Sequence, residues 1–268
     1  MLISSRRNPL VRALRQLHTP AGRRAAGLLL LEGTHLAQEA VRLKLPVQQL
    51  LCCPTWMQKH PELLQALCAQ LSAGCPLIEA SEPVLSAAAT TEHPDGVVLT
   101  LSPPAAADPA QARFALVLDG LQDPGNLGTL QRTALAAGIE QLWLAGGADP
   151  YQPKVLRASA GAALELPCWR ADREAIAAQI AAAAARGLQV AASVPPAGGG
   201  VPYWQLDWRK PTLLLLGAEG PGLSTELLEL ATHRVCIPHN KAVESLNVAV
   251  AAAPLLLERH RQERMPGI

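Results

Sequence analysis

The chain has 268 residues, of which 49% are hydrophobic, 17% are charged and 3% are aromatic, and its formal net charge is +1. This length and composition indicate a globular protein with room for two ordinary domains, and they exclude a disordered chain. The near-neutral charge identifies no partner, and so few aromatic rings argue against base stacking as the main mode of binding a nucleic acid.

The N-terminal segment is basic. Six arginines precede the first acidic residue, Glu32: Arg6, Arg7, Arg12, Arg15, Arg23 and Arg24. They form either a solvated helix face or a basic arm that contacts phosphates, and composition alone does not decide between the two. The N-terminus lacks the apolar core of a signal peptide, and no segment reaches the roughly 18 to 20 apolar residues of a membrane span. We therefore expect a soluble, cytoplasmic protein.

Short alternating elements follow, up to residue 103. "NPLVRALRQL" predicts a helix capped by Asn8 with Pro9 at its first position, "THLAQEAVRL" predicts a helix capped by Thr34, and "PELLQALCAQL" predicts a third helix. Strands are predicted for "GLLLLEG", "VQQLLCC" and "GVVLTL". Residues 1–103 are thus expected to form a small α/β domain, and the proline-rich residues 104–112 a linker.

Residues 113–268 continue the alternation on a larger scale. The predicted strands are "FALVLDGL", "IEQLWLAG", "LQVAASV", "TLLLLGAEG" and "HRVCIP". The predicted helices are "NLGTLQRTALAAG", "DREAIAAQIAAAAARG", one from Ser224 and a final one from Ser245. Near-continuous apolar strands that alternate with helices predict a parallel sheet covered on both faces. In such sheets, ligands bind at the loops that follow the carboxyl ends of the strands.

The cysteines do not suggest a metal site. They contain no C-x-x-C pair and no accompanying paired histidines, which disfavours zinc and iron–sulfur centres. We expect small core residues in a reducing compartment. The six are Cys52, Cys53, Cys68, Cys75, Cys168 and Cys236.

Two polar loops follow predicted strands. In "DGLQDPGNLGTLQRTA", residues 119–134, Asn126 can cap the following helix, and the long side chain of Arg132 can reach back toward the helix N-terminus, where anions collect. In "LLLLGAEGPGLS", residues 213–224, glycines allow close backbone approach to a ligand. The spacing matches neither the dinucleotide fingerprint nor the P-loop, and a plain tight turn with an exposed Glu219 is the alternative.

A third loop, "IPHNKAVESLNVAVAAA", joins a strand end to the final helix. Ser245 as the N-cap is a sufficient structural reason for one polar residue. It does not explain Asn247, which is a poor helix former without a compensating partner. Three such loops in one sheet predict a ligand site.

Taken together, these loops resemble the motifs of the SpoU (TrmH-like) class of RNA 2′-O-ribose methyltransferases in the SPOUT superfamily. The matching stretches are "NLGTLQRTA", "LLGAEGPGLS" and "IPHNKAVESLNVAVA", in the order of the class, and "KVLRASAGA" resembles a further stretch. The N-terminal half resembles the small L30e-like RNA substrate-binding domain that often accompanies this class, through "SRRNPLVRALRQL" and "LLLEGTHLAQEAV". This second likeness favours the basic arm as the RNA contact.

The resemblance implies a deep trefoil knot in the C-terminal domain, S-adenosylmethionine as the methyl donor and a homodimer formed through the knotted region. No metal and no membrane are expected, because the cysteine spacing and the absence of a long apolar segment already argue against both. By analogy, ten residues should surround the cofactor: Leu216, Gly217, Ala218, Glu219, Gly220, Ile237, Pro238, Ser245, Leu246 and Asn247.

The same resemblance assigns catalytic roles. The arginine matching Arg132 is the base proposed for the class, although a guanidinium rarely gives up its proton, so Arg132 is alternatively expected to hold a phosphate and stabilise the developing alkoxide. Asn126 is expected to orient Arg132 or the substrate phosphate. Ser245 and Asn247 are expected to line the target ribose, and Glu219 to fix the loop beside the cofactor.

Ribosomal RNA of the 23S type is the expected substrate. The alternatives are methylation of transfer RNA, an RNA-binding protein of the same fold without activity, and a Rossmann-type nucleotide enzyme, which the missing fingerprint disfavours. The sequence leaves open which nucleotide is modified, and whether the modification is housekeeping or confers antibiotic resistance.

Overall fold

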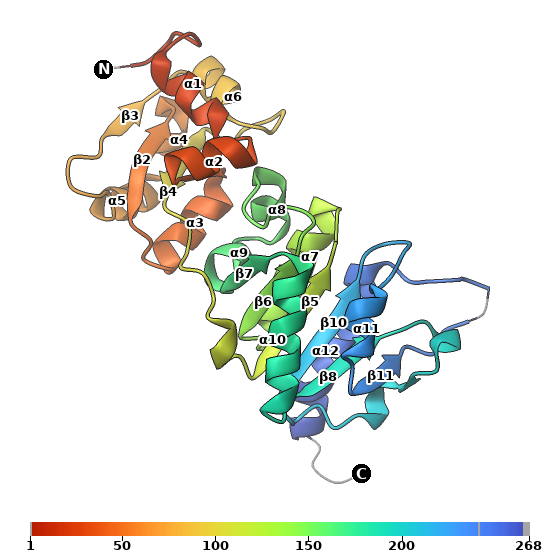
Figure 1. The fold of residues 1–268 in the computed structure, drawn as a ribbon. Coiled ribbons are helices and arrows are strands. Elements are labelled where there is room, and N and C mark those ends of the chain that lie inside the picture. The colour runs from red at the N-terminus through yellow and green to blue at the C-terminus, as the bar shows by residue number, and fades with distance from the viewer. Residues whose placement is uncertain (1, 241, 265–268) are drawn as a thin grey trace. The chain divides into compact units, whose positions relative to one another are not determined.

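A computed structural model describes residues 2–240 and 242–264 and divides the chain into two compact units (Figure 1). The first unit is Met1–Pro104 with Asp149–Glu165, and the second is Ala105–Ala148 with Leu166–Ile268. The segment Asp149–Glu165 thus groups with the N-terminal residues, although it interrupts the second half of the sequence. The predicted domain boundaries, with a linker at 104–112, stay a prediction.

The first unit is a four-stranded sheet in the order β1-β4-β2-β3, with helices around it. The central strand β4 is antiparallel to both β1 and β2, and β3 is parallel to β2. Its elements are α1 (Pro9–Gln16), α2 (Pro20–Ala26), β1 (Leu29–Glu32), α3 (Thr34–Arg42), β2 (Val47–Cys52), α4 (Pro54–Lys59), α5 (Pro61–Ala69), β3 (Leu77–Glu79), α6 (Glu82–Ala88), β4 (Val97–Leu101), α8 (Pro153–Ala158) and α9 (Ala162–Glu165).

Two helix starts in this unit test the capping predictions. Asn8 caps α1, because its side chain accepts a hydrogen bond from the Leu10 N–H at 2.9 Å, and Pro9 opens the helix as predicted. The predicted cap of α3 is wrong, since the N-cap is Gly33 and Thr34 is the first helical residue. The Thr34 hydroxyl instead accepts a hydrogen bond from the Trp56 indole N–H at 2.9 Å.

The second unit is a seven-stranded sheet in the order β7-β6-β5-β10-β8-β11-β9, and every neighbouring pair is parallel, as predicted. Its elements are η1 (Pro109–Gln111), β5 (Phe114–Asp119), α7 (Pro124–Ala136), β6 (Gln141–Ala145), β7 (Cys168–Ala171), α10 (Arg173–Ala185), β8 (Gln189–Ser193), η2 (Pro196–Gly198), β9 (Val201–Pro202), η3 (Tyr203–Gln205), β10 (Thr212–Gly217), α11 (Thr225–Glu229), β11 (His233–Cys236) and α12 (Val248–Arg264).

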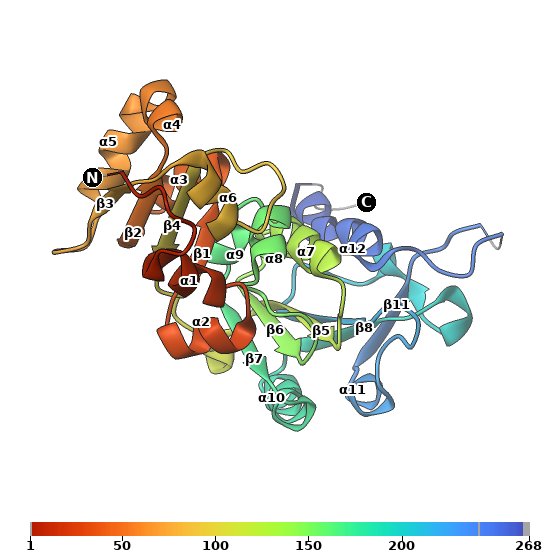
Figure 2. The same ribbon diagram turned by 90° about the horizontal axis from the view of Figure 1, so that it is seen from above.

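Helices cover both faces of this sheet (Figure 2). On one face, Ile176 and Ile180 of α10 and Leu227 of α11 join the apolar side chains of the strands in one buried cluster. On the other face, α12 packs against both α7 and β10. The near-continuous apolar strands follow from this double coverage, because both faces of each strand are buried.

The strand register places the polar loops at one edge of the sheet. Asp119, the last residue of β5, pairs with Gly217, the last residue of β10, and with Ala145 at the end of β6. Because the strands are parallel, the loops at 120–123, 218–224 and 237–247 all leave from their carboxyl ends. This is the edge at which such sheets bind ligands.

The starts of α7 and α12 differ from the prediction. Asp123, not Asn126, caps α7: its carboxylate accepts the Asn126 N–H at 2.7 Å, and the helix starts at Pro124. The final helix does not begin at Ser245. It begins at Val248, because the Asn247 amide oxygen accepts the N–H groups of Ala249 at 2.9 Å and Val250 at 3.2 Å. A carboxamide caps a helix at least as well as a hydroxyl, and here it directly precedes the apolar run.

Candidate active site

A chain of hydrogen bonds links the three polar loops. The Asn126 amide nitrogen donates to Glu219 Oε1 at 2.6 Å, and the Asn247 amide nitrogen donates to Asn126 Oδ1 at 3.1 Å. A carboxylate only accepts, so Asn126 must turn its NH₂ group toward Glu219 and its oxygen toward Asn247. The remaining oxygen of Asn247 caps α12, and both asparagine orientations are thereby fixed.

The loop after β10 folds back on itself; we call residues 217–224 the glycine ring. The Ala218 N–H donates to the Gly222 carbonyl at 3.2 Å, and the Gly222 N–H donates to the Ala218 carbonyl at 3.1 Å. Gly220 and Gly222 have φ angles of +91° and +70°, which favour glycine. A Cβ on Gly217 would lie 2.0 Å from the Gly222 carbonyl carbon, so this position also requires glycine.

An open hollow lies beside this network. Its lining comes from the loop after β5, the start of α7 and the glycine ring. The lining residues are Gly120, Gln122, Asp123, Pro124, Asn126, Ala218, Glu219 and Pro221. The hollow therefore lies at the carboxyl edge, between two of the loops that the sequence singled out.

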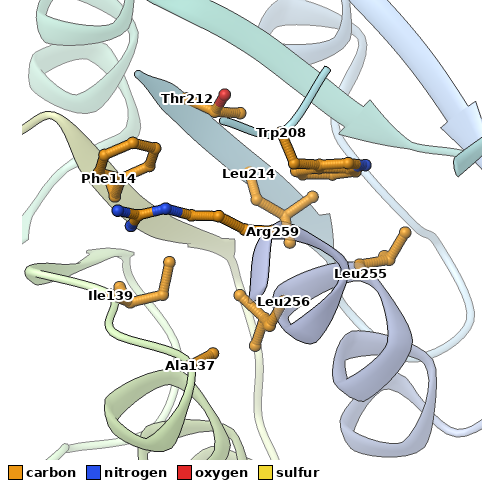
Figure 3. Close-up of a pocket in the computed structure, with 9 residues that line it drawn as sticks. All are labelled: Phe114, Ala137, Ile139, Trp208, Thr212, Leu214, Leu255, Leu256 and Arg259. Carbon is orange, nitrogen blue, oxygen red and sulfur yellow. The ribbon is translucent and has the colours of Figure 1, made fainter. Parts of the chain in front are cut away.

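A second, smaller pocket lies at the opposite edge of the sheet (Figure 3). Phe114 and Thr212, the first residues of β5 and β10, line it together with apolar side chains and Arg259. The Arg259 guanidinium lies over the Phe114 ring, 3.5 Å from its centroid. With a volume of about 20 Å³ this pocket has room for about one water molecule, so it is a packing gap and not a substrate site.

Arg132 lies on α7 and is exposed, and the described part of the chain gives its side chain no hydrogen bond or ion pair. It follows Asn126 by six residues, which places the two side chains about 120° apart around the helix axis. In this structure the Asn126 amide is bonded to Glu219 and Asn247 and not to Arg132. The expectation that Asn126 orients Arg132 or the substrate phosphate stays a prediction. The expected catalytic role of Arg132 stays a prediction.

The other residues expected to surround the cofactor lie inside β10 or in the loop that follows β11. Ser245 and Leu246 are exposed in the loop before α12, and neither takes part in a hydrogen bond with another described residue. Ile237 is half-buried and Pro238 is exposed directly after β11, whereas Leu216 is buried inside β10. Lys241 in the same loop lies outside the described residues. Their roles toward a cofactor remain expectations.

One functional candidate was missed by the sequence analysis. Asp119 ends the central strand β5 and is only 3% exposed. Its carboxylate accepts the Ser224 N–H at 2.8 Å and the Arg173 Nε–H at 3.0 Å. An acidic residue at the end of an otherwise apolar strand was the available signal.

In the first unit, five of the six N-terminal arginines are exposed: Arg6, Arg7, Arg12, Arg15 and Arg24. None of the five forms an ion pair with another described residue. Arg23 differs, because it is 4% exposed and donates to the Leu17 carbonyl at 2.8 Å and to Asp149 Oδ2 at 2.5 Å. The expectation that Arg23 contacts RNA is therefore corrected: its guanidinium joins α2 to the segment that begins at Asp149.

Among residues 2–240 and 242–264, no group of three or more His, Cys, Asp or Glu side chains is arranged to hold a metal ion. None of the helices in these ranges has the length and apolar character needed to cross a membrane. Burial raises the pKa of the Cys52 thiol to about 12, so this cysteine stays protonated at neutral pH.

Comparison with known proteins matches both parts of the chain. The model of the SpoU rRNA Methylase family matches residues 113–257, and that of the MRM3-like substrate binding domain matches residues 8–99. A protein of Synechocystis sp., named an uncharacterized tRNA/rRNA methyltransferase, is 45% identical over 97% of this chain and 94% of its own length. The Bacillus subtilis 23S rRNA (guanosine(2553)-2'-O)-methyltransferase RlmP is 32% identical over 95% and 97%.

Among solved structures, the AdoMet-bound rRNA methyltransferase from Sinorhizobium meliloti superposes with a TM-score of 0.84. It is 28% identical, and the superposition covers 98% of each chain. The likeness therefore extends over both units and is not confined to the loops.

Proposed function

The chain belongs to the SpoU rRNA methylase family, and from this premise we propose that it methylates a ribose 2′-hydroxyl of ribosomal RNA with S-adenosylmethionine as the methyl donor. It is an RNA methyltransferase, like the full-length relatives. The observation that carries the proposal is the convergence of Asn126, Glu219 and Asn247 at the carboxyl edge of the sheet.

The residues at this edge fit an amphipathic cofactor. The hollow beside the glycine ring is open, and the polar main-chain groups of Ser245 and Leu246 are not used within the described part of the chain. Leu246 and Ile237 offer apolar surface in the same loop. When bound, S-adenosylmethionine supplies an electrophilic methyl group on a positively charged sulfur.

The chain's own residues then have three tasks. Arg132, which is exposed and has no partner within residues 2–240 and 242–264, holds the phosphate next to the target nucleotide and stabilises the negative charge that develops on the ribose oxygen. A guanidinium stays protonated at neutral pH, which favours this role over that of a general base. Ser245 and Asn247 line the ribose, and the hydrogen bonds of Asn126 hold the loops in one arrangement, so that the hydroxyl meets the methyl group in line.

The first unit is proposed to bind the RNA substrate. Its five exposed arginines form no ion pair with another residue that the structure describes, and they are available to contact phosphates. Each contact of this kind positions the RNA without reading its sequence. We therefore assign RNA binding to the first unit, whose residues 8–99 match the substrate binding domain, and the chemistry to the parallel sheet.

A homodimer is part of the proposal. Apolar side chains on α12 and in the loop before it are exposed: Val250 by 63%, Leu257 by 44%, Leu246 by 37% and Val243 by 50%. Val250 and Leu257 are seven residues apart, so they lie on one side of the helix. A second copy of the chain would cover this stripe, and the knot typical of the class and a cytoplasmic location are proposed with it.

Incubating the purified protein with radiolabelled S-adenosylmethionine and ribosomal RNA from a strain lacking its gene tests the proposal. The expected result is transfer to one ribose, mapped as a single new 2′-O-methyl nucleotide. Methyl transfer to transfer RNA instead would show that transfer RNA, and not ribosomal RNA, is the substrate. Cofactor binding without transfer to either RNA would favour an RNA-binding protein without activity.

A further inference from the structure

The carboxylate of Asp119 is placed where both ends of the glycine ring meet. Asp119 pairs with Gly217, at the start of the ring, across the β5–β10 ladder. Its Oδ2 atom accepts the N–H of Ser224, at the end of the ring, at 2.8 Å. Asp119 therefore contacts both ends of the glycine ring, Gly217 through the strand pairing and Ser224 through its side chain.

The carboxylate is compensated from outside the ring. Arg173, the first residue of α10, donates from Nε to Asp119 Oδ1, and the Nη2–Oδ1 distance is also 3.0 Å. A carboxylate that is nearly fully buried is strongly unfavourable without such a partner. The Arg173 side chain itself is 45% exposed, so one end of this pair reaches the surface while the other holds the ring.

Asp119 does not line the hollow, whose walls begin at the next residue, Gly120. It therefore has no direct contact to offer a ligand there. Its influence passes through Ser224 into the ring, and from the ring through Glu219 to Asn126. A loop that is held in its binding conformation before the ligand arrives loses less conformational entropy on binding.

We propose that Asp119 and Arg173 are positioning residues for the cofactor: their ion pair holds the glycine ring in the conformation that binds S-adenosylmethionine. This inference rests on the proposed function for the identity of the ligand. The coupling between the pair and the ring is a property of the protein alone, so it can be measured without any ligand.

Four variants and one control separate this role from general destabilisation. Asp119→Asn and Arg173→Ala break the pair, and Arg173→Lys keeps the charge but loses the fork geometry. Ser224→Pro removes the N–H donor, together with a hydroxyl that has no hydrogen-bond partner among the described residues, at a residue whose φ of −62° suits proline. The control is Asp172→Asn, an exposed neighbour that caps α10 and keeps this function as asparagine.

Two measurements are made on each protein. Hydrogen exchange without ligand is expected to speed up at least tenfold in residues 218–224 of Asp119→Asn, Arg173→Ala and Ser224→Pro, with β5 and α10 still protected. Calorimetry is expected to show at least tenfold weaker binding of S-adenosylmethionine, with the affinity for ribosomal RNA within twofold of the unchanged protein. Arg173→Lys should be intermediate, and the control should match the unchanged protein.

Unchanged ring exchange and unchanged cofactor affinity in Ser224→Pro and Arg173→Lys would overturn the inference. Equal losses of cofactor and RNA binding, with faster exchange throughout the second unit, would also overturn it, because they indicate a general structural role. If the unchanged protein does not bind S-adenosylmethionine at all, the proposed function fails instead, and the exchange data still decide whether the pair holds the ring.

Discussion

Replacing Arg132 by alanine is expected to remove most of the methyl transfer while leaving the fold intact. The side chain is exposed and has no bonding partner among the described residues, so its loss should change the free energy of unfolding by no more than about 0.5 kcal/mol. If the guanidinium stabilises charge in the transition state, its loss should lower kcat by on the order of 10²- to 10³-fold, or about 2.7–4 kcal/mol. The expected loss of transition-state stabilisation is therefore several times larger than the expected loss of folding stability, so a catalytic effect can be distinguished from unfolding.

The assay is transfer of a radiolabelled methyl group to ribosomal RNA at saturating cofactor, together with calorimetric binding of S-adenosylmethionine and a urea unfolding curve. Cofactor affinity should stay within a few-fold, because Arg132 lies on α7 and is not bonded to the glycine ring. The matched control is Arg186→Ala, an exposed arginine at the C-terminal end of α10, near the opposite edge of the sheet. If the kcat of Arg132→Ala stayed within threefold of that of the unchanged protein, Arg132 would not be a catalytic residue.

Three further outcomes follow from the structure. Gly217→Ala should weaken cofactor binding at least tenfold by calorimetry, since the added Cβ would lie 2.0 Å from ring backbone; unchanged affinity would contradict the ring geometry. Arg23→Ala should destabilise the first unit by about 3–5 kcal/mol in urea unfolding, because it strands a partly buried carboxylate, whereas exposed Arg24→Ala should have little effect. Burial raises the pKa of Glu258, but accepted hydrogen bonds, first that from Arg261, outweigh it and lower the pKa. Glu258→Gln should thus destabilise the protein at pH 7. The difference should begin to shrink as the pH falls below about 4.3, the pKa of an unfolded glutamate, and should disappear only below the lowered pKa of the folded protein. A difference that persists at still lower pH would exclude this ion pair as its cause.

The elements with strong periodicity could be predicted from the sequence, and their ends could not. The apolar runs of β5, β8 and β10 and the alanine-rich α10 lie where the pattern placed them. The short elements α4 and β3 were missed, because too few residues repeat in them to define a period. The caps of α7 and α12 were predicted wrongly because each has two polar candidates, and the contacts of the neighbouring loop decide which side chain is available. The cap of α3 was predicted wrongly because Gly33, which has no side chain to signal a cap, takes that position.

The site shows the same division. The sequence selected Asn126, Glu219 and Asn247 as unusual residues after strands, and the structure joins them in one chain of hydrogen bonds. The sequence could not show which of these side chains bond to each other, because the bonded residues are 93 and 121 positions apart in the chain. The sequence analysis also treated Arg23 as one of six equivalent arginines. Its ion pair with the partly buried carboxylate of Asp149 distinguishes it from the other five.

By itself the sequence determined the class of fold, the edge of the sheet that carries the polar loops and the family resemblance, because periodicity and short motifs are local properties. Only the tertiary structure decided which amide faces which carboxylate, where α12 begins, and that Asp119 and Arg173 pair beneath the glycine ring. The physical reason is that hydrogen bonds and burial depend on distances between segments remote in the chain, which no local pattern records.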